Sequence, residues 1–342
     1  MPSPPVTRRC PSLLTPHSSL LTVLCAVLLL ATFVSLFWGR YPTLGFLSPA
    51  ALSSDPVAAA LFWNLRLPRV AAALLLGAAL SAAGHVMQMI FRNPLVEPGF
   101  LGVSQGAALG AAAAILAFGG SILAIQTSAA AGACLGLLLS HTLARRLRFG
   151  GWTLRLLLSG IAVSALFSSA LGLLKALSDP LRQLPDLTFW LMGGLYNVNA
   201  AALLRFLPLL LPALLILILM RWRLVLLSLG DDTARALGVR AAAERTLLLA
   251  AAAAATAAVV ALAGMVGWIG LLVPHLARRL VRSHPAASLP AAMLLGALFA
   301  LACDTLARSA PAEIPLGIVT SLLGASLFLA LMLRQPPDAP PS

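Results

Sequence analysis

The chain has 342 residues, of which 60% are hydrophobic and 10% are charged, and its mean hydropathy is +0.98. Soluble domains carry about 25% charged residues, so this composition excludes a soluble globular protein. The formal net charge is +13, and in so apolar a chain this basic excess indicates membrane topology and contact with anionic lipid rather than nucleic-acid binding.

Apolar runs of about 20 residues recur along the whole chain, and each can cross a hydrocarbon layer of about 30 Å. The first run has basic flanks like a signal peptide, but it is too long for one and lacks a small-residue cleavage site, so we expect it to remain as a helix. We predict an all-α polytopic membrane protein with ten spans, at 20–38, 67–90, 101–118, 121–144, 154–177, 203–221, 246–263, 265–281, 286–307 and 314–333.

The two ends of the chain, 1–19 and 334–342, are rich in proline and are predicted to be disordered tails around a single membrane domain, 20–333. With the N-terminus in the cytoplasm, 16 of the 23 Lys and Arg residues lie on the cytoplasmic side, as the positive-inside rule requires. An even number of spans then places the C-terminus in the cytoplasm as well.

The predicted spans also show an internal arrangement. Spans two to five and seven to ten form two groups of four helices, separated by span six and by a polar loop at 222–245. Counting crossings gives the two groups opposite orientations. Such inverted groups are typical of transporters.

The chain shows no energy source of its own. A nucleotide-binding P-loop needs a lysine in GxxxxGK[ST], and Lys175, the only lysine, lies in a predicted span. An ion-coupled carrier would need an intramembrane carboxylate or histidine. Asp304 is the main candidate, but Arg308 lies four residues on, on the same helix face, and is expected to pair with it. His85 and His275 are expected to be hydrogen-bonded packing residues, so the sequence favours a separate ATPase.

Two alternatives stay open at this point. An ion-coupled carrier working alone would transport without an ATPase. An intramembrane enzyme would need a convergent catalytic set, yet the histidines have no carboxylate near them in the sequence, and the four cysteines show no disulfide or metal spacing.

A basic motif, RLPR at 66–69, opens the second predicted span at the outer surface. Proline suits the first turn of a helix, and Arg66 and Arg69 lie near one face because they are three residues apart. These arginines either reach lipid headgroups or form a patch that binds carboxylates of a docking protein. Arg308, also near the outer surface, is a candidate third member.

The segment FRNPLVEPGFLGVSQG, at 91–106, is expected at the inner surface between the second and third spans. Pro94 and Pro98 break the helix there, and the next helix is expected to begin near Gly99. Irregular backbone is tolerated in a membrane only where protein or water covers it. A gate beside a transport pathway meets that condition, and a plain tight turn is the alternative.

The inner loop LSLGDDTARALGVRAAAER, at 227–245, is predicted to contain a short amphipathic helix at 231–237. Asp231 and Asp232 stand where a helix start favours acids, and Gly238 suits a left-handed C-terminal cap. An ordinary connector would be shorter. The exposed face of this helix therefore suits a protein partner.

Six blocks of the sequence resemble, in order, the pattern of the FecCD-type ABC importer permeases, which carry iron–siderophore complexes, haem or vitamin B12. The resemblance extends from about residue 60 to 333. The blocks are RLPR, GAALSAAGHVMQMIFRNPLVEPGFLGVSQGAALGA, LRQLPDLTFWLMGGL, LGDDTARALGV, GWIGLLVPHLARRLV and ALACDTLARSAPAEIPLGIVTSLLGASLF.

The resemblance implies a BtuC-like permease fold with ten helices in each subunit of a homodimer in the bacterial inner membrane. Two cytoplasmic ABC ATPase subunits would hold ATP and Mg²⁺, so this chain is expected to bind no cofactor or metal and to catalyse no covalent reaction. A periplasmic substrate-binding protein would dock outside. An iron(III)–siderophore complex is the expected cargo, with haem and cobalamin as alternatives.

The resemblance also assigns roles to residues of this sequence. It implies that Arg66, Arg69 and Arg308 dock the binding protein and that Asn93, Pro94 and Leu95 lie at the cytoplasmic gate. The loop that couples to the ATPase is expected to comprise Gly230, Asp231, Asp232, Ala234, Arg235, Leu237 and Gly238.

Overall fold

The computed structural model describes residues 16–41, 44–119, 121–281 and 285–333, and this part of the chain is almost entirely helical. The first group of elements is α1 (Pro16–Phe37), β1 (Trp38–Gly39), β2 (Gly45–Phe46), α2 (Ala51–Ser54), α3 (Pro56–Leu61), η1 (Phe62–Arg66), α4 (Leu67–Phe91), η2 (Pro98–Leu101), α5 (Val103–Phe118), α6 (Ile122–Arg146), α7 (Trp152–Leu177) and α8 (Gln183–Leu191). The rest is α9 (Ala200–Leu219), α10 (Arg221–Ser228), α11 (Asp231–Ala236), α12 (Ala241–Ala263), α13 (Ile269–Val281), α14 (Pro285–Ser309) and α15 (Leu316–Leu333).

The two predicted tails, 1–19 and 334–342, lie mostly outside the described residues. The C-terminal tail, 334–342, and residues 1–15 lie outside them, whereas residues 16–19 form the start of α1 and not part of a tail.

Eight helical runs in the described residues are long and apolar enough to cross a membrane, and they correspond to eight of the ten predicted spans. The other two predicted spans are the shorter helices α5 and α13, of 16 and 13 residues. At 1.5 Å per residue these helices are about 24 and 20 Å long, less than a full hydrocarbon layer. Each is short because irregular chain precedes it, 92–97 with η2 before α5 and 264–268 before α13.

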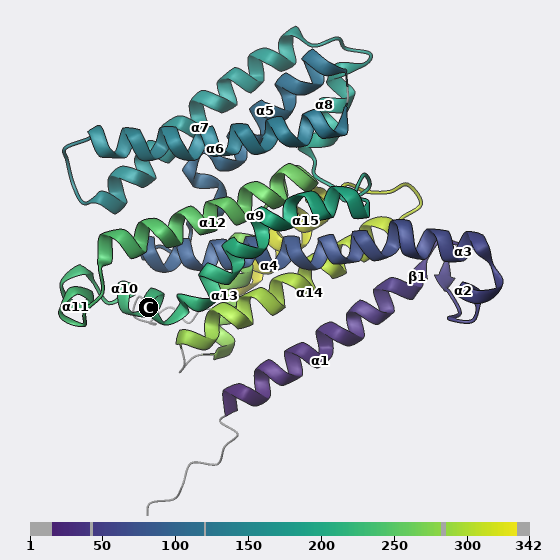
Figure 1. The fold of residues 1–342 in the computed structure, drawn as a ribbon, viewed down its shortest axis with the longest axis horizontal. Coiled ribbons are helices and arrows are strands. Elements are labelled where there is room, and N and C mark those ends of the chain that lie inside the picture. The colour runs from purple at the N-terminus through teal and green to yellow at the C-terminus, as the bar shows by residue number, and fades with distance from the viewer. Residues whose placement is uncertain (1–15, 42–43, 120, 282–284, 334–342) are drawn as a thin grey trace, which may run out of the picture.

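The two predicted four-helix groups are present as α4–α7 and α12–α15, and they run in opposite senses. In Figure 1, α4 starts at the end of the bundle that holds α3 and β1, whereas α12 starts beside α11 at the opposite end. Each group consists of a long buried helix, a break, a short helix and two further helices. The inverted organisation predicted from the sequence is therefore confirmed.

The helices pack in layers around α4 and α12, whose spans are the most buried. In Figure 1, α5, α6, α7 and α8 form an upper layer, α4, α9 and α12 lie beneath it, and α1 packs along the far side against α14. Small residues allow this close packing. A Cβ added at Gly84 of α4 would collide with the carbonyl oxygen of Gly270 in α13, and Gly106 and Gly132 exclude each other's Cβ in the same way between α5 and α6.

The RLPR motif begins the α-helix α4, which starts at Leu67 with a proline in its first turn as predicted, but it does not begin the whole helical run. Helical backbone already begins at Pro56, and Pro68 lies inside a continuous run from Pro56 to Phe91. The π-helical turn η1 precedes Pro68, and in it the N–H of Leu67 bonds to the carbonyl of Phe62, five residues back. Proline removes one helical N–H donor, and a π turn at that place accommodates the loss.

Candidate functional site

The end of the bundle that was predicted to face outward gathers the predicted docking arginines around the C-terminus of α1. Arg66 donates to the carbonyl oxygens of Leu36 and Phe37, at 3.3 and 3.4 Å. Arg308 donates to the carbonyl and the hydroxyl of Ser35, the latter at 2.7 Å. The last carbonyls of a helix lack intrahelical partners, and cations there are stabilised by the helix dipole. These two arginines therefore cap α1 and do not extend to lipid headgroups.

Arg69 is held by two carboxylates. Its guanidinium contacts Asp304 on α14 at 2.8 and 2.9 Å and Glu313 at 2.7 Å. Arg308 approaches Asp304 only to 3.7 Å. The expected pairing of Asp304 with Arg308 is thus present, but Arg69 from α4 is the nearer partner. The sequence could not show this, because the two residues are far apart along the chain.

Burial limits how these arginines can act. Arg66 is 9% exposed, and the side chains of Arg69 and Arg308 are 15% and 10% exposed, whereas the Glu313 side chain is 41% exposed. Burial, followed by the nearby carboxylates of Glu313 and Asp186, raises the pKa of Tyr196 to about 12. At this end of the bundle the Glu313 carboxylate is therefore accessible and the nearby Tyr196 phenol stays neutral, while the three arginines are more deeply buried.

The opposite end of the bundle carries the predicted coupling loop. The short helix expected at 231–237 is present as α11, and Gly238 follows it with φ +77°, the left-handed cap that was predicted. Ala234 is fully buried, while Leu237 is 55% exposed. Asp232 and Arg235 form an ion pair of 3.3 Å on the solvent side. The loop thus combines a buried anchor with an exposed apolar side chain.

The predicted gate residues form a tight turn directly after α4. Asn93 accepts a hydrogen bond on Oδ1 from the N–H of Leu95 at 2.9 Å, as in an Asx turn. Pro94 is exposed, and Leu95 is 56% exposed. Arg92, just before them, ends α4 with φ +49°, a left-handed conformation that is uncommon for a residue with a side chain.

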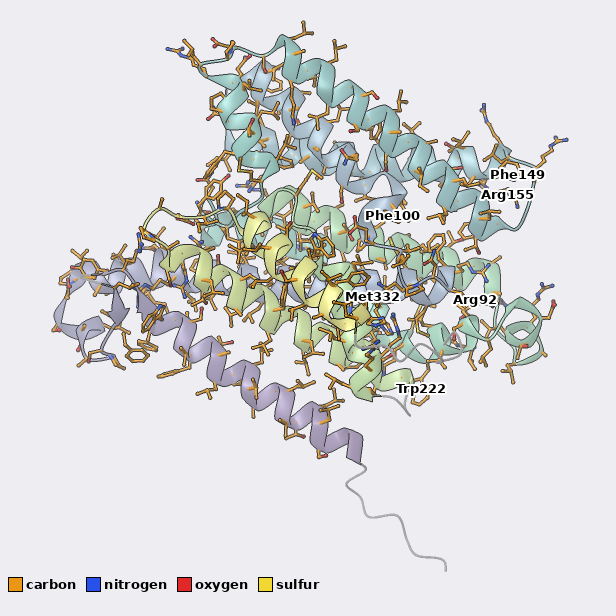
Figure 2. The ribbon with its side chains drawn as sticks, turned by 180° about the vertical axis from the view of Figure 1, so that it is seen from behind. Arg92, Phe100, Phe149, Arg155, Trp222 and Met332 are labelled. Carbon is orange, nitrogen blue, oxygen red and sulfur yellow. The ribbon has the colours of Figure 1, made fainter. Side chains whose placement is uncertain are left out.

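Arg92, the residue before the predicted gate turn, lies against the predicted coupling loop. Arg92 and Gly230 line a cavity of about 480 Å³ together with Phe91, Asp232 and Arg245. A Cβ added at Gly230 would lie 3.3 Å from Nη2 of Arg92. Figure 2 shows Arg92 at the same end of the molecule as Arg155 and Trp222. Two segments far apart in the sequence thus share one surface.

The whole segment 91–106 was predicted to lie at one surface of the bundle, and this prediction is wrong for its second half. The chain turns back into the bundle after Arg92, and the ring of Pro98 packs against Gly270 beside the carbonyl of Leu80, halfway along α4. Figure 2 shows Phe100 nearer the middle of the bundle than Arg92. Re-entry is possible because η2 is covered by α7 and α12, which satisfies the requirement that irregular backbone be shielded from lipid.

A central cavity of about 470 Å³ lies where the two irregular segments meet. Glu97 lines it from just before η2, Gln105 from the first turn of α5, and Trp268 from just before α13. Thr256 of α12 contributes from the side. Trp268 has φ +71°, a second left-handed residue with a large side chain. Most of the lining is apolar, with Glu97 as its one ionisable side chain among the described residues.

Of the two histidines expected to be hydrogen-bonded packing residues, His85 behaves as one, whereas Nε2 of His275 is buried without a hydrogen-bond partner among the described residues. His85 is buried, with Nε2 at 3.0 Å from the hydroxyl of Ser288. Beside it, Gln88 accepts from Arg278 at 2.7 Å and donates to the carbonyl of Leu271 at 3.0 Å, which ties α4 to α13. Within the described ranges, no group of three or more His, Cys, Asp or Glu could hold a metal ion.

The chain is similar to known transport proteins. The model of the FecCD transport family matches residues 27–334. The chain is 39% identical over 330 residues to the molybdate import system permease protein MolB of Haemophilus influenzae, covering 93% of this chain and 96% of the relative. It is 43% identical over 277 residues to the hemin transport system permease protein HmuU of Yersinia pestis, covering 80% and 83%.

A solved inward-facing structure, described as a metal-chelate type ABC transporter, matches with a TM-score of 0.85 and 39% identity. The match covers 93% of this chain and 100% of the solved chain. The family model, the relatives and the shared fold agree with the inverted helix groups. The chain is an ABC importer permease of the FecCD transport family.

Proposed function

We propose that this permease moves an iron(III)–siderophore complex across the bacterial inner membrane, with both of its termini in the cytoplasm. Haem and cobalamin are the alternative cargoes. The chain itself catalyses no covalent reaction, and ATP and Mg²⁺ are bound by a separate cytoplasmic ATPase. The observation that carries this proposal is the central cavity, where the two irregular segments of the inverted groups meet.

The size and lining of the cavity support a bulky organic chelate. Its volume of about 470 Å³ falls within the range of about 300–1,000 Å³ that small-molecule sites occupy. Its lining is mostly apolar and includes no basic side chain among the described residues. A small dianion such as molybdate, the substrate named for the Haemophilus relative, would gain little from such a surface.

Movement is proposed to pass from the ATPase to the gate through Arg92. The ATPase would engage α11 on its exposed side, where Leu237 is accessible. Arg92 is packed beside Gly230 at the start of α11 and is followed at once by the gate turn Asn93–Leu95. A displacement of the coupling loop therefore reaches the gate through one side chain, and the exposed Leu95 is placed to close against a second copy of the chain.

Docking of a periplasmic binding protein is proposed at the outer mouth. Arg69 holds the buried Asp304 and the half-exposed Glu313. A carboxylate of the binding protein can take the place of Glu313 on Arg69, while Asp304 keeps the arginine in position. Arg66 and Arg308 lie next to it and add positive potential.

The proposal is tested in proteoliposomes that contain the full-length permease together with its partner ATPase and its substrate-binding protein. Uptake of a labelled iron(III)–siderophore, haemin, cobalamin and molybdate is measured with and without ATP. We expect ATP-dependent uptake of the iron(III) chelate and none with an ATPase that lacks its P-loop lysine. Uptake of molybdate alone would refute the cargo assignment, and uptake without the ATPase would refute the mechanism.

A further inference from the structure

Glu97 is an unpaired carboxylate deep in the bundle. It immediately precedes Pro98, which packs at the level of Leu80 halfway along α4. Within the described part of the chain, no hydrogen bond or ion pair reaches its side chain, and no basic residue lines the cavity beside it. An ionisable group at membrane depth is costly and is usually paired or functional.

Three other carboxylates that are buried or half-buried in the described chain each have a side-chain partner, which Glu97 lacks. Asp304 is held by Arg69, Glu244 by Arg223 and Asp55 by the hydroxyl of Tyr41 at 2.8 Å. Glu97 instead faces a cavity. A molecule that enters this cavity would therefore meet a carboxylate that no described side chain holds.

The surroundings of Glu97 add groups that suit a cationic or donor-rich ligand. Ser104 lies close by, since a Cβ added at Gly99 would be 3.1 Å from its hydroxyl and 3.6 Å from Oε1 of Glu97. Ser164 lines the same cavity and has a buried hydroxyl with no partner. Trp268 and Phe100 add aromatic surface, and aromatic faces attract cations.

We propose that Glu97 is a contact for cargo in transit, and that it makes the central cavity favour chelates carrying a positive charge over uncharged or anionic chelates of the same size. This inference rests on the proposed import of metal chelates. The carboxylate accepts hydrogen bonds from ammonium, N–H or O–H groups of the cargo. A single carboxylate contact favours cationic cargo but adds little to its total affinity, so the cargo can still leave the cavity.

The test uses two matched iron(III) chelates. Ferrioxamine B carries a free ammonium group, and its N-acetylated form has the same iron-binding shell without that charge. Binding to the full-length permease in lipid nanodiscs is measured by quenching of tryptophan fluorescence. Wild type should bind the cationic chelate roughly tenfold more tightly, as expected for one charge-assisted contact. A Trp268→Phe variant should lose most of the quenching, which places the chelate in the cavity.

The decisive variant is Glu97→Gln, which keeps the shape and removes the charge. It should bind both chelates equally, while Asp186→Asn on the outer helix α8, a matched loss of one carboxylate, should keep the tenfold difference. Equal affinities in wild type, a difference that persists in Glu97→Gln, quenching unchanged by Trp268→Phe, or no binding of either chelate would each overturn the inference. ATP-driven uptake, measured separately, distinguishes a wrong cavity assignment from a wrong cargo class.

Discussion

The ion pairs among Arg69, Asp304 and Arg308 lead to a prediction about the stability of an Asp304 variant. The residue is fully buried and contacts Arg69 at 2.8 Å and Arg308 at 3.7 Å. Replacing Asp304 by Ala leaves two guanidiniums, 15% and 10% exposed, with fewer partners. Removing one member of a buried ion pair destabilises a protein by about 3–5 kcal/mol. We expect the lower end of that range, because Glu313 and the α1 carbonyls still bind the arginines.

The assay is thermal unfolding of the purified permease in detergent, followed by size-exclusion chromatography of heated samples. Glu313→Gln is the matched control, since its side chain is 41% exposed and a surface ion pair contributes at most about 1 kcal/mol. A double variant, Asp304→Leu with Arg69→Met, should recover most of the loss, because apolar residues of similar volume often replace a buried pair without penalty.

Two results would refute this reasoning. Equal stability of Asp304→Ala and Glu313→Gln would show that the buried pair does not hold α4 to α14. A loss of stability in Asp304→Ala that the Asp304→Leu, Arg69→Met double variant does not recover would show that the unpaired buried arginine is not its cause.

Three further predictions concern packing and coupling. Gly84→Ala should destabilise the fold by about 1–3 kcal/mol in the same unfolding assay, because the added methyl group collides with the backbone of α13. The control Gly172→Ala should be neutral or stabilising, because a Cβ at Gly172 meets nothing within 4 Å. Leu237→Asp should weaken co-purification with the ATPase at least tenfold, while Leu181→Asp, 88% exposed near α8, should leave it unchanged. Arg92→Ala should lower cargo transported per ATP hydrolysed in proteoliposomes without loss of ATPase assembly; unchanged stoichiometry would exclude Arg92 as the link.

Much of the helix pattern could be predicted because apolar length alone specifies a membrane span. The last helix, predicted at 314–333, is observed at Leu316–Leu333, and the long span predicted at 154–177 is observed at Trp152–Leu177. Local capping signals were also sufficient for α11, since its start at Asp231 and its left-handed end at Gly238 depend on neighbouring residues only.

The parts that could not be predicted depend on contacts between distant residues. The nearer partner of Asp304, Arg69, lies on α4. Sequence spacing within α14 could indicate only Arg308, which makes the longer contact. Hydropathy did not distinguish the shorter α5 and α13 from full spans, because part of the irregular chain before each helix is also apolar. The depth of Glu97 follows from the packing of Pro98 against Gly270, which no local pattern contains.

The central claim is that this permease is a passive conduit driven by ATP hydrolysis on another chain. Its most direct test is cargo accumulation by the permease alone in proteoliposomes with an imposed proton or sodium gradient, compared with the complete assembly supplied with ATP. The account predicts accumulation only in the complete assembly with ATP. Accumulation by the isolated permease on an ion gradient would contradict it.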